Sequence, residues 1–224
     1  RDQPRSRGLG DVYKRQAGLY TETCQLVVRA DSDIQTLDDL SGHTVSIGAK
    51  ESGTERNASQ ILEFAGMPSS LVATKNLDYI EATKELKAGD IDAFFCTAGL
   101  TTTVIDELSK ECDIRLIPLT DTVISKMLES SSAYTSEVIP AGTYTGQTTD
   151  ISTIGVKSVL ITKSDVSDDT IEQLTSLLFE KENELSYSNS LKLELTYDFA
   201  TGDIPIPFHK GAKRYYEDCG YSAN

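Results

Sequence analysis

Short apolar segments alternate with amphipathic ones along most of the chain. Apolar runs with the length of buried strands stand at residues 25–29, 44–47, 91–96 and 114–119. The clearest helical segment follows the second run, because Ala58, Ile61, Leu62 and Ala65 have the i, i+3, i+4, i+7 spacing of a helix face that packs on a core. Strands that alternate with helices predict an α/β fold, with a mostly parallel sheet and helices on both of its faces.

The last third of the chain is expected to be organised differently. Residues 138–150 form a polar loop, and residues 151–162 form a strand long enough to cross between two lobes. A helix is predicted over residues 168–182, with Ile171, Leu174 and Leu178 on its inward face. An extended segment that contains prolines then leads into a short helix, which begins near residue 210.

The second apolar run passes into its helix through Ser52, Gly53 and Thr54, which we call the first turn. Backbone N–H groups at a helix N-terminus and the helix dipole favour an anion, so this turn suits a carboxylate or a phosphate. The simpler alternative is that Ser52 only caps its helix, because Ser52 and Glu55 have the spacing of a capping box.

A second candidate turn follows the next predicted strand. Thr97, Ala98 and Gly99 form this second turn, and a further helix is predicted after it. Ligands of open α/β sheets bind beyond the carboxyl ends of the strands. Two such turns from one sheet are therefore candidates for the same ligand.

Residues that perform catalysis are not found in familiar arrangements. The first turn nearly completes a phosphate-binding loop, but Thr54 stands where that loop requires lysine. A nucleophile elbow requires a glycine two residues before its serine, and Lys50 is there instead. The two histidines, His43 and His209, have no identified partner for acid–base work, and no cluster has the spacing of metal ligands. We therefore expect a binding protein rather than an enzyme, with no catalytic residue, no cofactor and no metal.

Composition and charge narrow the range of partners. The formal net charge of the 224 residues is -14, and an acidic surface repels phosphate backbones, so nucleic acid is not expected as a partner. No stretch approaches the ~18 consecutive apolar residues of a transmembrane helix. The cysteines lack C-x-x-C spacing, and Cys24 and Cys96 fall in strand-like runs, where buried free thiols are common.

Residues 1–16, RDQPRSRGLGDVYKRQ, do not continue these patterns. The segment holds five Lys/Arg and two Asp without periodicity, and it resembles a translated sequencing-adapter scar. We exclude it from the fold prediction, as a fusion scar is excluded. The expectation that follows is that the native N-terminus is missing, together with any signal or lipoprotein peptide.

Several segments, taken in order, resemble one family. They are ETCQLVVRADSDIQTLDDLSGHTVSIG, SGTERNASQILEFAG, LKAGDIDAFFCTAG, IPAGTYTGQTTDISTIGV and IPIPFHKGAKRYYEDCG. Within residues 19–220 they resemble the TAXI family, the extracytoplasmic solute-binding receptors of TRAP transporters. The first turn, the I-P-A-G-T-Y-x-G-Q block and the P-x-H-x-G-A-x-x-Y-Y tail are specific in combination, whereas each alone is a weak signal.

The resemblance implies a periplasmic-binding-protein-like fold of type II, in which two α/β lobes form a ligand cleft. Residues 44–149 would form the second lobe, and residues 17–43 and 150–224 a partial first lobe with its crossover strands. Family members open with a further strand, turn and helix, and these are missing here. We therefore expect one lobe to be incomplete and the chain to be an N-terminally truncated fragment.

The resemblance also implies a function. It predicts an extracytoplasmic receptor that binds a small anionic solute, such as glutamate or a related dicarboxylate, and delivers it to a TRAP membrane permease. Such a receptor is periplasmic, or extracellular and membrane-associated, and we expect a monomer. The family's ligand contacts carry over to the residues Ser52, Gly53, Thr54, Thr97, Ala98, Gly99 and Tyr144. His209 matches a histidine of the family's tail, which we interpret as structural.

Two departures from the family and one competing function accompany this interpretation. Lys50 and Glu51 precede the first turn where members often have small residues, and Thr101 stands where proline is frequent. The competing function is the ligand-binding effector domain of a cytosolic transcriptional regulator, because a shared fold does not fix a function. An upstream DNA-binding segment would favour the regulator, and an upstream signal peptide beside a permease gene would favour the receptor.

Overall fold

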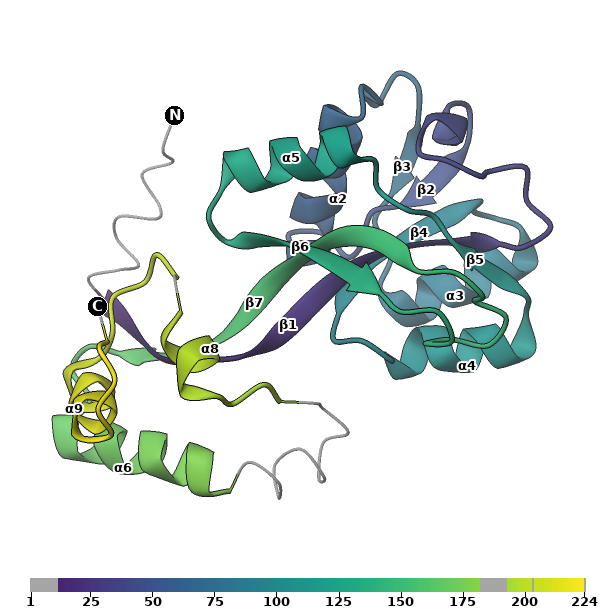
Figure 1. Ribbon diagram of the computed structural model, residues 1–224. Coiled ribbons are helices and arrows are strands. Elements are labelled where there is room, and N and C mark those ends of the chain that lie inside the picture. The colour runs from purple at the N-terminus through teal and green to yellow at the C-terminus, as the bar shows by residue number, and fades with distance from the viewer. Residues whose placement is uncertain (1–11, 182–192, 203, 224) are drawn as a thin grey trace. The chain divides into compact units, whose positions relative to one another are not determined.

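The structure is a computed structural model that describes residues 12–181, 193–202 and 204–223 (Figure 1). The helices and strands in the first part of the chain are β1 (Tyr13–Arg29), η1 (Asp38–Leu40), β2 (Thr44–Ser46), α2 (Gly53–Phe64), β3 (Ala73–Lys75), α3 (Tyr79–Ala88), β4 (Ala93–Ala98) and α4 (Thr103–Glu111). The remaining elements are β5 (Ile114–Leu116), α5 (Asp121–Ser130), β6 (Tyr134–Ile139), β7 (Ile151–Lys163), α6 (Asp168–Glu180), α8 (Tyr197–Thr201) and α9 (Lys210–Asp218). Residues 1–11 of the excluded segment, and the predicted end of a helix at residue 182, lie outside the described residues.

The strands form one mixed sheet in the order β3-β2-β4-β1-β7-β6, and β5 pairs with β1. β2 is parallel to β3 and β4, whereas β1 is antiparallel to β4 and β5, and β6 is antiparallel to β7. The predicted α/β class is confirmed, but the expectation of a mostly parallel sheet is wrong. Parallel strands need a crossover connection, and β6 and β7 are joined by a loop instead.

The chain divides into two compact units, and the boundary between them falls within β1 and β7. The larger unit comprises residues 22–156, and the smaller unit comprises the described residues up to 21 and from 157 onward. Residues 22–43 thus belong with residues 44–156, although the family resemblance placed them in the other lobe. The division into ligand-binding lobes at residues 43/44 and 149/150 stays a prediction.

The larger unit has a core on each face of its sheet. One core lies under α2 and α5 and the other under α3 and α4, so helices cover both faces, as expected from the sequence (Figure 1). Adjacent residues of a strand point to opposite faces, and Phe94 and Phe95 of β4 accordingly belong to different cores. Cys24 and Cys96 are buried free thiols, which confirms that expectation.

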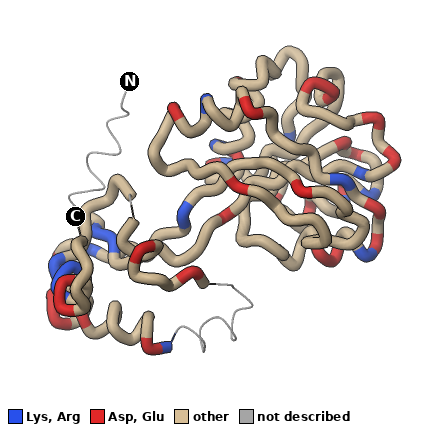
Figure 2. The backbone as a smooth tube through the Cα atoms, in the orientation of Figure 1, with Lys and Arg blue, Asp and Glu red and all other residues tan. Residues whose placement is uncertain are grey.

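The smaller unit is built on the packing of α6 against α9. A Cβ added to Gly211 would lie 2.0 Å from the carbonyl oxygen of Asp168, so only glycine permits this approach. Residues of opposite charge lie along the same pair of helices (Figure 2). The Arg214 guanidinium lies 2.8 Å from the Glu172 carboxylate. His209 is buried and caps α9, because its Nδ1 accepts a hydrogen bond from the Gly211 amide at 3.1 Å. This contact supports the structural interpretation of His209.

Three further details differ from the sequence predictions. The strand predicted over residues 25–29 extends back to Tyr13, so part of the excluded segment belongs to β1. In this part of β1, Arg15 Cζ lies 3.7 Å from the ring centroid of Phe208. Leu174 is 48% exposed, and α6 buries Ile171 and Thr175 instead, because the face toward α9 follows an i, i+4 row. Neither α5 nor β6 was predicted; β6 is mostly half-exposed and has no continuous apolar run.

Candidate ligand-binding site

The two predicted turns lie at the same edge of the sheet. β2 and β4 are parallel neighbours, with Val45 opposite Ala93 and Ser46 opposite Phe94. Each strand is followed by a connecting loop, and α2 follows β2 through the first turn while α4 follows β4. The first turn therefore occupies the position where ligands of open α/β sheets bind, beyond the carboxyl end of a strand.

The loop before the first turn requires glycine at one position. Gly48 has a φ of +95°, and a Cβ there would lie 2.7 Å from the Cβ of Thr54. Glu51, directly before Ser52, also has a positive φ, +65°. A left-handed conformation costs an L-residue roughly 1–2 kcal/mol, so the contacts around this loop must hold Glu51 in place.

Ser52 is the N-cap of α2, and its Oγ accepts a hydrogen bond from the Glu55 amide at 3.1 Å. The predicted capping box is only half formed. The Glu55 carboxylate accepts from the Glu51 amide and from Asn76 Nδ2, whereas the Ser52 amide donates to the Ala49 carbonyl at 3.1 Å. The positive φ of Glu51 reorients the backbone here, so the carboxylate meets the Glu51 amide instead of the Ser52 amide.

Two amides remain at the start of α2. In the part of the chain that the structure describes, the amides of Gly53 and Thr54 have no hydrogen-bond acceptor, as expected for the first residues of an α-helix. Both can donate to an anion, which the helix dipole also favours at this end. The helix-cap alternative therefore accounts for Ser52 and leaves these two donors available.

A single tyrosine hydroxyl joins the first turn to β4. Tyr79 Oη, at the start of α3, lies 2.6 Å from Thr54 Oγ1 and donates to the Thr97 carbonyl oxygen at 2.9 Å. The Thr97 amide donates back to Tyr79 Oη at 3.3 Å. Thr54 and Thr97 are both buried. The structure thus brings the first turn and Thr97 into one hydrogen-bonded network.

Two further members of this network were missed by the sequence analysis. Asn57 is buried; its Nδ2 donates to Thr97 Oγ1 at 3.3 Å, and its Oδ1 accepts from Tyr134 Oη at 3.0 Å. The sequence held a signal for Asn57, because it follows Thr54 by three residues and therefore shares a helix face with it. It held none for Tyr134, which lies in the unpredicted strand β6.

The groups around Thr97 are neutral at physiological pH. Burial raises the pKa of Tyr79 to about 12, and burial also raises the pKa of Tyr134. Burial raises the pKa of Cys24 to about 12, although a hydrogen bond with Thr97 opposes this shift. These groups therefore act as neutral donors and acceptors, and Cys24 is not a thiolate nucleophile.

The second turn differs from its prediction. Thr97 and Ala98 are the last residues of β4, and Gly99 is the first residue of the connecting loop. Thr101 has a φ of +60°, and Thr102 is the N-cap of α4 without a capping hydrogen bond from its side chain. The loop that leads into α4 thus spans residues 99–102.

Tyr144 supports the start of α4. Its side chain is 3% exposed and belongs to the core under α3 and α4. Its Oη accepts from the Thr102 amide at 3.3 Å and donates to Gln25 Oε1 at 2.7 Å, and burial raises its pKa to about 12. The structure does not bring Tyr144 to the first turn, so its role as a ligand contact stays a prediction.

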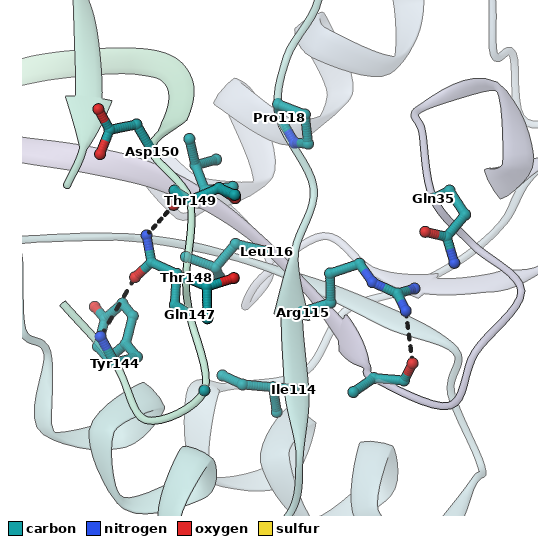
Figure 3. A pocket seen from close by; sticks show the side chains of 13 residues that line it. Gln35, Ile114, Arg115, Leu116, Pro118, Tyr144, Gln147, Thr148, Thr149 and Asp150 are labelled. Atoms are coloured by element: carbon teal, nitrogen blue, oxygen red, sulfur yellow. Dashed lines mark hydrogen bonds between the residues drawn. The ribbon is translucent and has the colours of Figure 1, made fainter. Parts of the chain in front are cut away.

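A cavity of about 400 Å³ lies in the larger unit, between β5 and the loop that precedes β7 (Figure 3). Arg115 lines it, but its guanidinium donates to three carbonyl oxygens of residues 30–34. Gln147 fixes the loop by donating to the Thr149 carbonyl at 3.0 Å. Of the predicted ligand residues, the lining of this cavity includes Tyr144 alone, so the cavity is separate from the first turn.

Within residues 12–181, 193–202 and 204–223, no group of three or more His, Cys, Asp or Glu side chains is arranged to hold a metal ion. Over the same described ranges, no helix combines the length and the apolar character that crossing a membrane requires.

Solved structures of solute-binding proteins are similar to the chain at low sequence identity. Holo ArgBP from T. maritima is 18% identical, with 83% of this chain and 64% of that one covered and a TM-score of 0.41. The periplasmic aliphatic sulphonate binding protein SsuA from Escherichia coli is 14% identical, with coverage of 84% and 54% and a TM-score of 0.46. Substrate binding domain 2 of Lactococcus lactis GlnP, in an open conformation, is 11% identical, with coverage of 90% and 67% and a TM-score of 0.42. The chain therefore spans less than two thirds of the length of the first two.

A match to a protein-family model covers far more of the chain than any single motif does. The model of the NMT1-like family matches residues 16–220. That range includes both predicted turns, β2 to β7 and the helices from α2 to α9. This chain belongs to the NMT1-like family.

Proposed function

We propose that this chain is the solute-binding part of an extracytoplasmic receptor, and that it holds a small carboxylate at the start of α2. The observation that carries the proposal is the pair of amides at Gly53 and Thr54, which have no acceptor among the described residues. They stand beyond the carboxyl end of β2 and are tied through Thr54 to the end of β4. Consecutive amides at a helix N-terminus match the oxygens of an anion.

The surroundings of these amides favour a carboxylate held by neutral groups. Thr54, Asn57 and Thr97 are the buried polar residues of the network, and none of them is charged. An anion there would be stabilised by the helix dipole and by hydrogen bonds rather than by a buried salt bridge. Binding without a titrating partner predicts an affinity that changes little between about pH 6 and pH 9, because the nearby tyrosine pKa values are raised.

The finer assignment rests on the sequence segments that resemble the TAXI family. We propose a TAXI-type receptor that takes up glutamate or a related dicarboxylate outside the cytoplasm and delivers it to a TRAP permease, without catalysis. The solute, the permease and the location are properties of a whole receptor, and this chain spans only part of the length of the similar solved structures.

The test removes one amide proton at the first turn. Gly53 is the first residue of α2, and a Cβ there would meet nothing within 4 Å, so alanine fits. Proline is well tolerated at the first helical position, and Ser52 already has the extended conformation that precedes proline. Gly53→Pro therefore removes the amide donor, whereas the matched control Gly53→Ala keeps it.

Calorimetry with L-glutamate and succinate measures the result, and L-arginine and ethanesulfonate serve as comparison solutes. A hydrogen bond to a charged group is worth about 1.5–3 kcal/mol, so Gly53→Pro should weaken carboxylate binding roughly tenfold to a hundredfold. Gly53→Ala should bind as the parent does. Equal affinities of the two variants would show that the carboxylate is held elsewhere, and a parent protein that binds neither carboxylate would overturn the proposal.

A further inference from the structure

The partly buried hydroxyl of Tyr79 has one proton and three hydrogen-bonding neighbours. Its Oη lies 2.6 Å from Thr54 Oγ1, 2.9 Å from the Thr97 carbonyl oxygen and 3.3 Å from the Thr97 amide nitrogen. The carbonyl can only accept and the amide can only donate. The one proton of Tyr79 therefore goes either to the Thr97 carbonyl or to Thr54 Oγ1.

Tyr79 occupies the place of a strand partner. In an antiparallel pair, the N–H and C=O of one residue point to the same side, and the sides alternate along the strand. The Cys24 carbonyl accepts a hydrogen bond from Thr153 Oγ1 of β7, so the backbone groups of Cys24 point to the side of β1 that faces away from β4. Thr97 of β4 is the residue opposite Cys24. The N–H and C=O of Thr97 therefore point away from β1, toward β2. Because β2 ends at Ser46, the hydroxyl of Tyr79 takes up both groups instead.

Two arrangements of protons satisfy this geometry. In the first, Tyr79 donates to the Thr97 carbonyl and Thr54 donates to Tyr79, so the two hydroxyls and the Thr97 backbone groups are paired without a ligand. In the second, Tyr79 donates to Thr54 Oγ1, and the Thr54 proton is released toward another acceptor. An anion bound at the first turn supplies that acceptor and favours the second arrangement, whereas an empty turn favours the first.

We propose that Tyr79 is a positioning residue whose hydroxyl sets whether Thr54 donates or accepts, and that it thereby couples occupation of the first turn to the end of β4. This inference rests on the proposed function, because it requires an anion at the first turn. It assigns to Tyr79 a part in binding although Tyr79 itself does not contact the solute. The Thr54 hydroxyl reaches the solute as a donor only when Tyr79 releases the Thr97 carbonyl.

Amide hydrogen exchange tests the bridge without any ligand. Tyr79→Phe keeps the ring and removes the hydroxyl, so the Thr97 amide should exchange roughly fivefold to tenfold faster, as expected for the loss of one hydrogen bond. Tyr134→Phe is the matched control, because Tyr134 belongs to the same network through Asn57 but is not bonded to the Thr97 backbone. An unchanged Thr97 exchange rate in Tyr79→Phe would overturn the coupling, whatever the protein binds.

A double-mutant cycle tests the coupling to the solute. L-glutamate affinity is measured for the parent, Tyr79→Phe, Thr54→Val and the double variant. Tyr79→Phe removes the hydroxyl that donates to Thr54 Oγ1 and so orients the Thr54 proton toward the solute in the second arrangement. It should therefore weaken binding about tenfold when Thr54 is present and less than about twofold in the Thr54→Val background. A role of Tyr79 limited to structure would give the same loss in both backgrounds, and that result overturns the proposal. If neither glutamate nor succinate binds the parent, the proposed function fails and the coupling fails with it, whereas additive losses in proteins that do bind refute the coupling alone.

Discussion

Two helices begin after neighbouring parallel strands, α2 after β2 and α4 after β4, and each N-cap follows a non-glycine residue with a positive φ. These residues are Glu51, at +65°, and Thr101, at +60°. The N-cap of α2 is secured by its own side chain, because Ser52 Oγ accepts from the Glu55 amide. Thr102, the N-cap of α4, has no such bond, and its amide instead donates to Tyr144 Oη at 3.3 Å.

The start of α2 is held mainly by residues close to it in the sequence, whereas the start of α4 is held by a residue far along the chain. The start of α2 depends on residues 48–55 and on two residues that follow β3 closely, Asn76 and Tyr79. The start of α4 depends on a tyrosine from a loop far along the chain, anchored on Gln25 in the core. Changes in the loop should therefore disturb α2 alone, and changes in the core should disturb α4 first.

The largest effect is expected from Gly48→Ala. The new Cβ would lie 2.7 Å from the Cβ of Thr54 at a φ of +95°, so the substitution combines backbone strain with overlap. We expect a loss of about 2–5 kcal/mol in the free energy of unfolding, measured by urea denaturation. In hydrogen exchange, the amides at the start of α2 should lose protection before those at the start of α4.

The control for this variant is Gly42→Ala in the same unit. Gly42 has a φ of +85°, but a Cβ there would meet nothing within 4 Å, so only the backbone term of about 1–2 kcal/mol applies. If the two variants lose equal stability, the contact between Gly48 and Thr54 does not define the first turn. If protection falls equally at α2 and α4, the two helix starts are not independent.

The same contrast between local and remote contacts explains what could be predicted from the sequence. The helix face of Ala58, Ile61 and Leu62 was predictable, because the 3.6-residue period is a local property, and all three side chains are buried in α2. The direction of β1 was not predictable. An apolar run has the same composition in parallel and antiparallel pairs, and only the long-range register with β4 and β5 decides between them.

In the candidate site too, local features were predictable from the sequence and long-range contacts were not. The first turn was predictable because a cap, a glycine and a helix start are neighbours in sequence. Asn57 shares a helix face with Thr54, so its spacing was a usable signal. Tyr79 and Tyr134 come from two other elements and reach the network only through packing, so no spacing in the sequence identifies them. Tyr144 was found through the family block, but its partners Gln25 and Thr102 could not be inferred from that block.

An intermediate effect is expected from Tyr144→Phe, which removes the support of α4. The change leaves Gln25 Oε1 and the Thr102 amide without this partner, and Gln25 Nε2 already has none among the described residues. Unsatisfied buried groups of this kind cost about 1–3 kcal/mol. Urea denaturation at pH 7 should show that loss, and hydrogen exchange should place it at the start of α4. Loss of protection at the start of α2 instead would show that Tyr144 supports α2 rather than α4.

At alkaline pH, the difference in the free energy of unfolding between the parent and Tyr144→Phe should become smaller. Burial raises the pKa of Tyr144 to about 12 in the folded protein, compared with about 10 in the unfolded chain. The folded state then holds its proton more tightly, so the stabilisation is complete below pH 10 and is lost as the pH rises toward 12. The parent should lose about 1 kcal/mol by pH 11 through this group, whereas Tyr144→Phe should not. The stability difference between them should shrink from pH 9 to pH 11; a constant difference would mean that the Tyr144 pKa is not raised.

The smallest effect, and the sharpest comparison, comes from truncating the two N-cap side chains. Ser52→Ala removes the hydroxyl that accepts from Glu55 and should cost about 1 kcal/mol. Thr102→Ala removes a hydroxyl that makes no capping bond, while its amide still reaches Tyr144, so the loss should stay below about 0.5 kcal/mol.

Ser52 and Thr102 differ in residue type, so Thr120→Ala at the start of α5 serves as a control. Thr120 is a threonine whose hydroxyl accepts a hydrogen bond from the Val123 amide at 3.3 Å. If capping by the side chain is what distinguishes the helix starts, Thr120→Ala should resemble Ser52→Ala and not Thr102→Ala. Urea denaturation of the three variants under one condition decides the matter. Equal losses at Thr102 and Thr120 would mean that α4 is capped by its own residue after all, and the remote role of Tyr144 would then be redundant. A loss confined to Ser52 and Thr120 would leave Tyr144 as the support that α4 needs because its own N-cap side chain provides none.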